Sequence, residues 1–144
     1  MPKRWEFFDH TADVGIVGYG ETPAEALASA GVGLFGVMTD LSRVQETAVR
    51  RIEVAGQDLP DLLVAWLNEL LYIFEVDGLV FARFEVELKD EGRRLVAIGY
   101  GERFDASRHE VRLGVKAATH HLAVVEPVAG ATSPTWRAMA ILDV

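Results

Sequence analysis

No cysteine occurs among the 144 residues of this chain. Its absence excludes disulfides, thiolate nucleophiles and zinc sites built on Cys ligands. The sequence also lacks a phosphate-binding loop, a dinucleotide-binding glycine pattern and a nucleophile elbow. Gly18-Tyr19-Gly20 has no other part of such a motif, and Gly31-Val32-Gly33 falls inside an expected helix. From the residues alone, no catalytic arrangement stands out.

No long uninterrupted apolar run is present either. No apolar leader follows Met1, so we expect no signal peptide and a cytoplasmic protein. The most apolar segment, residues 59–74, carries Asp61, Asn68 and Glu69. This pattern is typical of an amphipathic helix and not of a membrane span, so we expect no membrane partner.

Basic residues are in the minority, with 14 Lys and Arg against 22 Asp and Glu and a formal charge of −8. Such a surface is a poor match for naked nucleic acid, whose phosphates require a basic face. It suits a protein partner with a basic face, a metal ion, or solubility alone.

Two helices carry the clearest signals. The first begins at Thr22, with Pro23 and Glu25 completing a capping box, and ends at Thr39-Asp40. The second begins at Asp58 and is broken at Asp77-Gly78. Its apolar stripe is the most regular in the chain and comprises Leu59, Leu62, Leu63, Trp66, Leu67, Leu70, Leu71 and Phe74.

The remaining segments predict strands. They are residues 5–9, 14–19, 48–55, 80–88, 94–100, 111–125 and 136–142. The last run is apolar on both faces and is therefore expected inside a sheet. We predict an α+β fold in which two helices pack on one face of a mixed, mostly antiparallel sheet. Residues 1–144 are expected to form one domain.

Acidic residues near the two ends of the chain form the first candidate site. His10 and Asp13 bracket a turn, where side chains three residues apart can converge. Asp143 precedes Val144, whose free carboxylate adds a second acidic group. If both ends lie side by side, these oxygen donors suit Mg²⁺, Mn²⁺ or Ca²⁺. The alternative is that Asp13 caps a turn and that the terminal carboxylates are simply solvated.

Four further residues are weaker candidates. Lys116, in the long strand, could pair with a buried acid or contact phosphate, or could lie on an exposed face. His109 and Glu110 could serve acid–base chemistry, although a surface loop without a function is the simpler expectation. Glu69 could reach a site at the sheet edge or flank the helix stripe in solvent.

Taken together, these segments resemble the archease family over the whole chain, in order and without large insertions. The residues that carry the resemblance are Trp5-Glu6, His10-Thr11-Ala12-Asp13-Val14-Gly15-Ile16, Gly18-Tyr19-Gly20, Asn68-Glu69-Leu70-Leu71, Asp77-Gly78-Leu79-Val80-Phe81, Tyr100-Gly101-Glu102, His109-Glu110, Val115-Lys116-Ala117-Ala118-Thr119-His120-His121, Trp136 and Leu142-Asp143-Val144. The chain departs from the family at position 120, where Tyr is usual.

The resemblance implies an accessory protein and not an enzyme. Archeases assist the tRNA-splicing ligase, which joins RNA 3′-phosphate or 2′,3′-cyclic phosphate ends to 5′-hydroxyl ends. They promote guanylylation of the ligase histidine, restore multiple turnover and can broaden nucleotide use beyond GTP. The resemblance also implies a divalent ion held by Asp13, Asp143 and Val144, and contact with RNA only through the ligase.

Two alternatives remain open at this stage. One is a stand-alone metal-dependent phosphohydrolase, against which stands the thin set of ligands and the lack of an evident base. The other is a chaperone-like or RNA-binding module, which should show a basic patch with stacking aromatics. Here the basic residues are scattered along an acidic chain.

Overall fold

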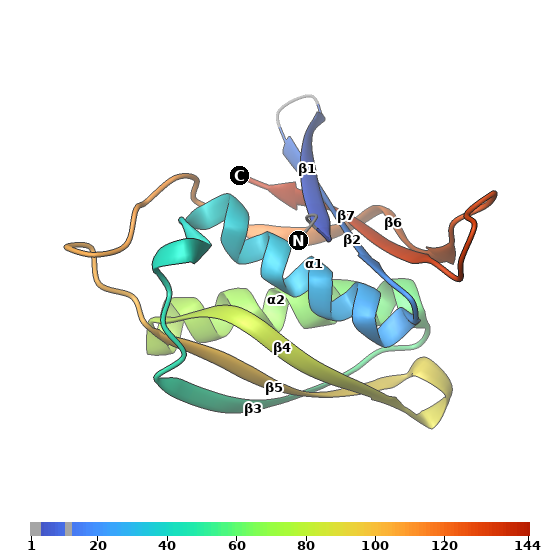
Figure 1. Cartoon of the computed structure of the whole chain (residues 1–144), viewed down its shortest axis with the longest axis horizontal. Helices are drawn as coiled ribbons and strands as arrows, with labels where there is room; N and C mark the ends of the chain where they lie inside the picture. The colour runs from blue at the N-terminus through green and yellow to red at the C-terminus, as the bar shows by residue number, and fades with distance from the viewer. Residues whose placement is uncertain (1–3, 11–12) are drawn as a thin grey trace.

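Seven strands form two antiparallel sheets in the computed structural model, which describes residues 4–10 and 13–144. The four-stranded sheet has the order β1-β2-β7-β6 and the three-stranded sheet the order β3-β5-β4 (Figure 1). The strands are β1 (Trp5–His10), β2 (Asp13–Gly20), β3 (Ala48–Ala55), β4 (Leu79–Lys89), β5 (Arg94–Arg103), β6 (Ala117–Pro127) and β7 (Trp136–Asp143).

Both helices begin and end where their capping residues predict. The first, α1 (Pro23–Met38), starts after Thr22, whose hydroxyl accepts a hydrogen bond from the backbone N–H of Glu25 at 3.2 Å. The second, α2 (Leu59–Asp77), starts after Asp58, whose carboxylate accepts from the N–H of Asp61 at 2.9 Å. These bonds satisfy amide groups that the first turn of a helix leaves without partners.

The C-terminal end of α2 is set by Gly78, which has a φ of 69°. Glycine adopts this left-handed conformation without steric cost and so ends the helix there. Among the residues that the structure describes, no helix is long and apolar enough to cross a membrane.

The helices lie between the two sheets (Figure 1). Helix α1 contacts β2 on one side and β4 on the other, while α2 contacts β6 and β3. A helix enclosed in this way must be apolar around most of its circumference, and ten of the residues in α1 are buried. One hydrophobic cluster therefore draws side chains from both helices and both sheets.

The predicted α+β class and antiparallel pairing are confirmed. Each sheet has helices on one face, but the strands divide between two sheets and do not form a single one. The division follows from α1, whose two apolar sides each need a sheet to cover them. As expected, β7 is an interior strand.

The strand predicted at residues 111–125 is wrong in its first part. Residues 111–116 are irregular, and β6 begins at Ala117. The irregular segment carries the chain from the three-stranded sheet to the four-stranded one across the end of α1, where the N–H of Arg112 donates to the carbonyl of Met38 at 2.9 Å. The register of β6 against β7 also shifts between Thr119 and Val124.

Because Gly18 has no side chain, α1 can approach β2 closely. A Cβ atom at Gly18 would lie 2.5 Å from the carbonyl oxygen of Ala26 and 2.8 Å from the Cα of Ala30. Both are backbone atoms of the helix and cannot rotate away. Close packing at this point depends on glycine, because a methyl group would force the helix off the sheet.

We therefore predict that Gly18→Ala lowers the free energy of unfolding by about 3 kcal/mol, the upper part of the range for overpacked sites. Gly114→Ala is the matched control, since a Cβ there meets nothing within 4 Å. Urea denaturation of both variants measures the difference. Equal midpoints for the two variants would contradict the close-approach explanation.

Candidate metal site and the surrounding polar network

The two ends of the chain meet on neighbouring strands. The pairing of β2 with β7 runs from Gly20–Trp136 to Val14–Leu142. The observed pairing stops there; continued by one residue, the same register would place Asp13 opposite Asp143, and Figure 1 shows the C-terminus beside the β1–β2 hairpin. Directly opposed residues in an antiparallel pair have side chains on the same face. The two positions predicted as ligands thus lie at the same end of neighbouring strands.

The pairing of β1 with β2 places His10 opposite Asp13 in register. The side chain of His10 lies outside the described residues. Val144 is half-buried and packs against the core at the end of β7. The four positions predicted for the acidic cluster therefore fall at one end of the four-stranded sheet.

Lys116 approaches the acidic pair through its backbone and not its side chain. Its N–H donates to the carbonyl of Asp143 at 2.8 Å. Because Ala117 pairs with Asp143, the preceding side chain points toward the opposite face of the sheet. There Lys116 lines a hollow of about 400 Å³ together with Glu75 and Phe74 of α2.

The chemistry of Asp13 and Asp143 fits a divalent cation. Carboxylate oxygens are hard donors, and like charges that face each other across two strands destabilise the sheet unless a cation lies between them. Within residues 4–10 and 13–144, no three His, Asp or Glu side chains gather closely enough to hold an ion. The described part of the candidate site thus contains two carboxylates, Asp13 and Asp143, and a divalent ion there stays a prediction.

Glu69 does not join this group in the described part of the molecule. It is half-buried on α2 and forms no ion pair or side-chain hydrogen bond with another described residue. Glu69 instead flanks the apolar stripe of α2, which was one of the two expectations from the sequence.

His109 is buried, so the expected position in a surface loop is wrong. Only 3% of the residue is exposed, and its ring stacks on Phe104 at 5.5 Å between centroids. The backbone N–H of Asp105 donates to Nδ1 at 2.8 Å. The ring proton therefore lies on Nε2, which is 3.3 Å from a carboxylate oxygen of Glu102.

Glu102 is the centre of this polar network. Its carboxylate accepts hydrogen bonds from the backbone N–H of Gln45 and from the guanidinium of Arg108, in addition to the contact with His109. Burial raises the pKa of Glu102, but the bond from Gln45, the bond from His109 and the charge of Arg108 outweigh it and lower the pKa below its ordinary value. The carboxylate ties β5 to the segment before β3 and to the connection that follows β5.

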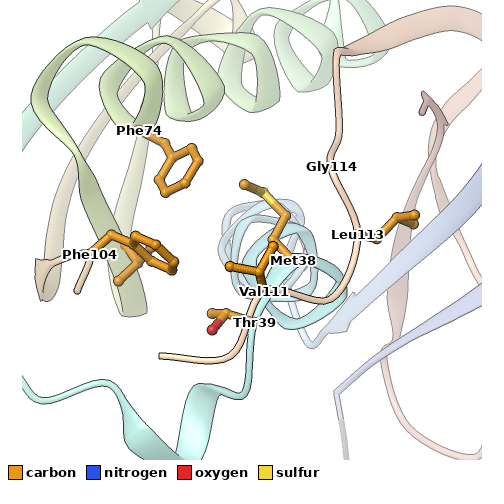
Figure 2. Close-up of a pocket in the computed structure, with 8 residues that line it drawn as sticks. Met38, Thr39, Phe74, Phe104, Val111, Leu113 and Gly114 are labelled. Carbon is orange, nitrogen blue, oxygen red and sulfur yellow. The ribbon is translucent and has the colours of Figure 1, made fainter. Parts of the chain in front are cut away.

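That connection also covers an apolar cavity of about 260 Å³ at the ends of the two helices. Figure 2 shows the side chains of Met38, Phe74 and Phe104 turned toward one another, with Val111 beside them. The hydroxyl of Thr39 donates to the carbonyl of Glu110 at 2.6 Å and holds the connection against α1. His109 and Glu102 thus have a structural role beside the cavity.

Comparisons with known proteins identify the family. The sequence model of the Archease protein family (MTH1598/TM1083) matches residues 5–144. Protein archease of Pyrococcus abyssi is 40% identical over 144 residues, with 99% of each chain covered. The chain belongs to the archease family. Protein archease of Pyrococcus furiosus is 37% identical, again over 99% of both chains.

A solved structure supports the same assignment within the archease family. The solution structure of Methanobacterium thermoautotrophicum protein 1598 superposes with a TM-score of 0.81 at 37% identity. The match covers 99% of this chain and 100% of that one. The arrangement of two sheets around two helices is therefore shared with a family neighbour of known structure.

His120, the position at which the chain departs from the archease pattern, lies on the surface. Its Nε2 is 2.9 Å from a carboxylate oxygen of Asp61. The backbone N–H of Gln57 and then His120 lower the pKa of Asp61. The histidine thus links the irregular part of β6 to the first turn of α2. The side chain of His120 is 69% exposed. An ion pair so exposed contributes little to stability.

We predict that Glu102→Gln lowers the free energy of unfolding by roughly 2 kcal/mol at pH 7, as expected when a buried carboxylate loses charge-assisted bonds. Because folding lowers the pKa of Glu102, its contribution is complete above the ordinary value of 4.5 and is lost as the pH falls through the folded value. The difference from wild type should therefore shrink below about pH 4.

Denaturant melts at pH 7 and pH 3 measure this difference. Glu87→Gln is the control, because Glu87 is exposed and, among the described residues, its carboxylate forms an ion pair with Lys89 alone, at 3.7 Å. A Glu102→Gln penalty that is the same at both pH values would rule out the proposed charge dependence.

Proposed function

We propose that this protein activates the tRNA-splicing RNA ligase. In this role it promotes guanylylation of the ligase histidine, sustains multiple turnover and broadens nucleotide use beyond GTP. The ligase would be its protein partner in the cytoplasm, and RNA would be contacted only through the ligase. The protein itself would carry out no chemical step.

Membership of the archease family over residues 5–144 is the observation that carries this proposal. The alignment of Asp13 with Asp143 supports it, because the family resemblance assigns a divalent ion to this pair and to Val144. These three residues would hold the ion. When bound, Mg²⁺, Mn²⁺ or Ca²⁺ supplies a positive charge able to neutralise phosphate oxygens.

The surface charge supports a protein partner and not direct binding of RNA. The formal charge is −8. Many of the arginines that the structure describes are already engaged by neighbouring carboxylates, as in the pairs Arg83–Glu46 and Arg50–Asp77. A ligase cleft that binds RNA and GTP is basic, so an acidic protein is electrostatically suited to approach it.

The two acids have distinct parts in this scheme. Asp143 is exposed at the end of an interior strand, where its backbone is held on the β6 side by Lys116 and Ala117 while its carboxylate stays accessible. Asp13 is half-buried in the neighbouring strand, directly before Val14, which pairs with Leu142. A preorganised pair on rigid strands can present an ion at the edge of the protein without a large rearrangement.

The test is multiple-turnover RNA ligation by the cognate ligase with GTP, measured with and without this protein. We expect wild type to raise the reaction beyond one turnover. Asp13→Asn and Asp143→Asn should lose most of the stimulation and bind Mn²⁺ at least about tenfold more weakly, since even outer-shell changes cost that much. Glu87→Gln, which removes an exposed acid elsewhere, should behave as wild type.

Stimulation that survives in both folded aspartate variants would contradict the proposed use of the acid pair. No stimulation by wild type, with a ligase that is active alone, would contradict the activator role itself. Hydrolysis of a phosphate ester with Mn²⁺ that is lost in Asp13→Asn would favour the hydrolase alternative.

A further inference from the structure

Asn68 on α2 makes an unusual contact with the backbone of β6. Its Nδ2 donates to the carbonyl of Ala118 at 3.1 Å, and the N–H of Ala118 donates to its Oδ1 at 2.8 Å. One side chain therefore satisfies both backbone groups of one residue. A neighbouring strand would offer the same donor and acceptor, so Asn68 takes the place of the strand that this edge of the sheet lacks.

The part of β6 that Asn68 contacts is short. Only Ala117, Ala118 and Thr119 pair with β7 before the register shifts, and pairing resumes at Val124. The preceding residues, 111–116, are irregular. A three-residue edge segment between two irregular stretches has few backbone hydrogen bonds to resist fraying. The double bond from Asn68 holds its outer edge.

This short segment lies beside Asp143, one of the two acids of the candidate site. Ala117 lies opposite Asp143 in the register, and the N–H of Lys116 donates to the carbonyl of Asp143 at 2.8 Å. The strand on the other side of Asp143 is β2, which carries Asp13. Movement of residues 116–119 would thus release the backbone contacts that hold Asp143 on the β6 side.

We propose that Asn68 is a positioning residue for the candidate ion site. It acts through the backbone of Ala118 to hold residues 116–119 against β7, and so keeps Asp143 aligned with Asp13. This inference rests on the proposed function, because the site it serves is the ion site of the activator. Asn68 touches neither the acids nor an ion.

A purely structural role would predict something different. If Asn68 only joined a helix to a sheet, its loss would lower the global stability of the protein. Any other substitution that destabilised the protein equally would then weaken ion binding by the same amount. Ile52→Val provides that comparison, because Ile52 is 3% exposed and lies on β3 of the other sheet. It removes one buried methyl group far from the acidic pair.

The experiment compares wild type, Asn68→Leu and Ile52→Val in two measurements. Amide hydrogen exchange of the metal-free proteins, followed residue by residue, reports whether residues 116–119 and 143 stay protected. Titration with Mn²⁺ alone reports affinity. Leu has the same branched shape as Asn, although it is larger, and lacks both hydrogen-bonding groups, while Asn68→Asp, the second variant, keeps the acceptor for Ala118 N–H.

We expect Asn68→Leu to lose protection at residues 116–119 and 143 and to bind Mn²⁺ about tenfold more weakly, the usual effect of removing an outer-shell support. Asn68→Asp should show a smaller loss, and Ile52→Val should bind Mn²⁺ as wild type does. Unchanged protection, unchanged affinity in Asn68→Leu, or equal weakening in Ile52→Val would each overturn the inference.

Mn²⁺ binding by the wild-type protein shows separately whether the proposed ion site fails. If wild type binds no Mn²⁺ while residues 116–119 lose protection in Asn68→Leu, the ion site is wrong and the positioning role falls with it. If wild type binds Mn²⁺ and Asn68→Leu does so equally, only the role of Asn68 is overturned.

Discussion

The register of β7 is the constraint on which the site depends. This strand is hydrogen-bonded to β2 on one side and β6 on the other, and its last residue is Asp143. Because side chains alternate along a strand, a shift of one residue would turn Asp143 to the helix-facing side and bring Leu142 to the outer face. The buried side chains of β7 oppose such a shift.

Those buried side chains also explain how the helices pack. Ala138, Ala140 and Leu142 lie on the same face of β7 and are fully buried. The two alanines are small, which lets α1 lie close to the sheet, as does Gly18 on the neighbouring strand. The core thus fixes the register, and the register sets where the acids fall. The position of the acids at the sheet end is in this sense a consequence of packing at its centre.

Local signals were sufficient to predict some of this architecture. Thr22 and Asp58 define the helix starts because a capping side chain acts on residues only three positions away. The apolar character of β7 on both faces indicated an interior strand. The existence of two sheets was not predictable in the same way, because an apolar surface on α1 shows that it is covered but not by which strands.

The same distinction applies to the site. The acids at positions 13 and 143 could be singled out as oxygen donors, but only the pairing of β2 with β7 aligns them. The burial of His109 was not predictable, because its ring contacts Glu102, and that carboxylate is held in turn by the N–H of Gln45 from a distant part of the chain. Asn68 does not belong to the apolar stripe, and its hydrogen bonds to Ala118 join residues 50 positions apart, so the helix pattern did not predict them.

The most direct test of this account is a crystal structure of the protein grown with Mn²⁺, with anomalous diffraction used to locate the ion. The account predicts one strong peak between the carboxylates of Asp13 and Asp143, absent in the Asp13→Asn variant. A peak elsewhere, or none at millimolar Mn²⁺, would contradict the claim that the register of β7 builds an ion site.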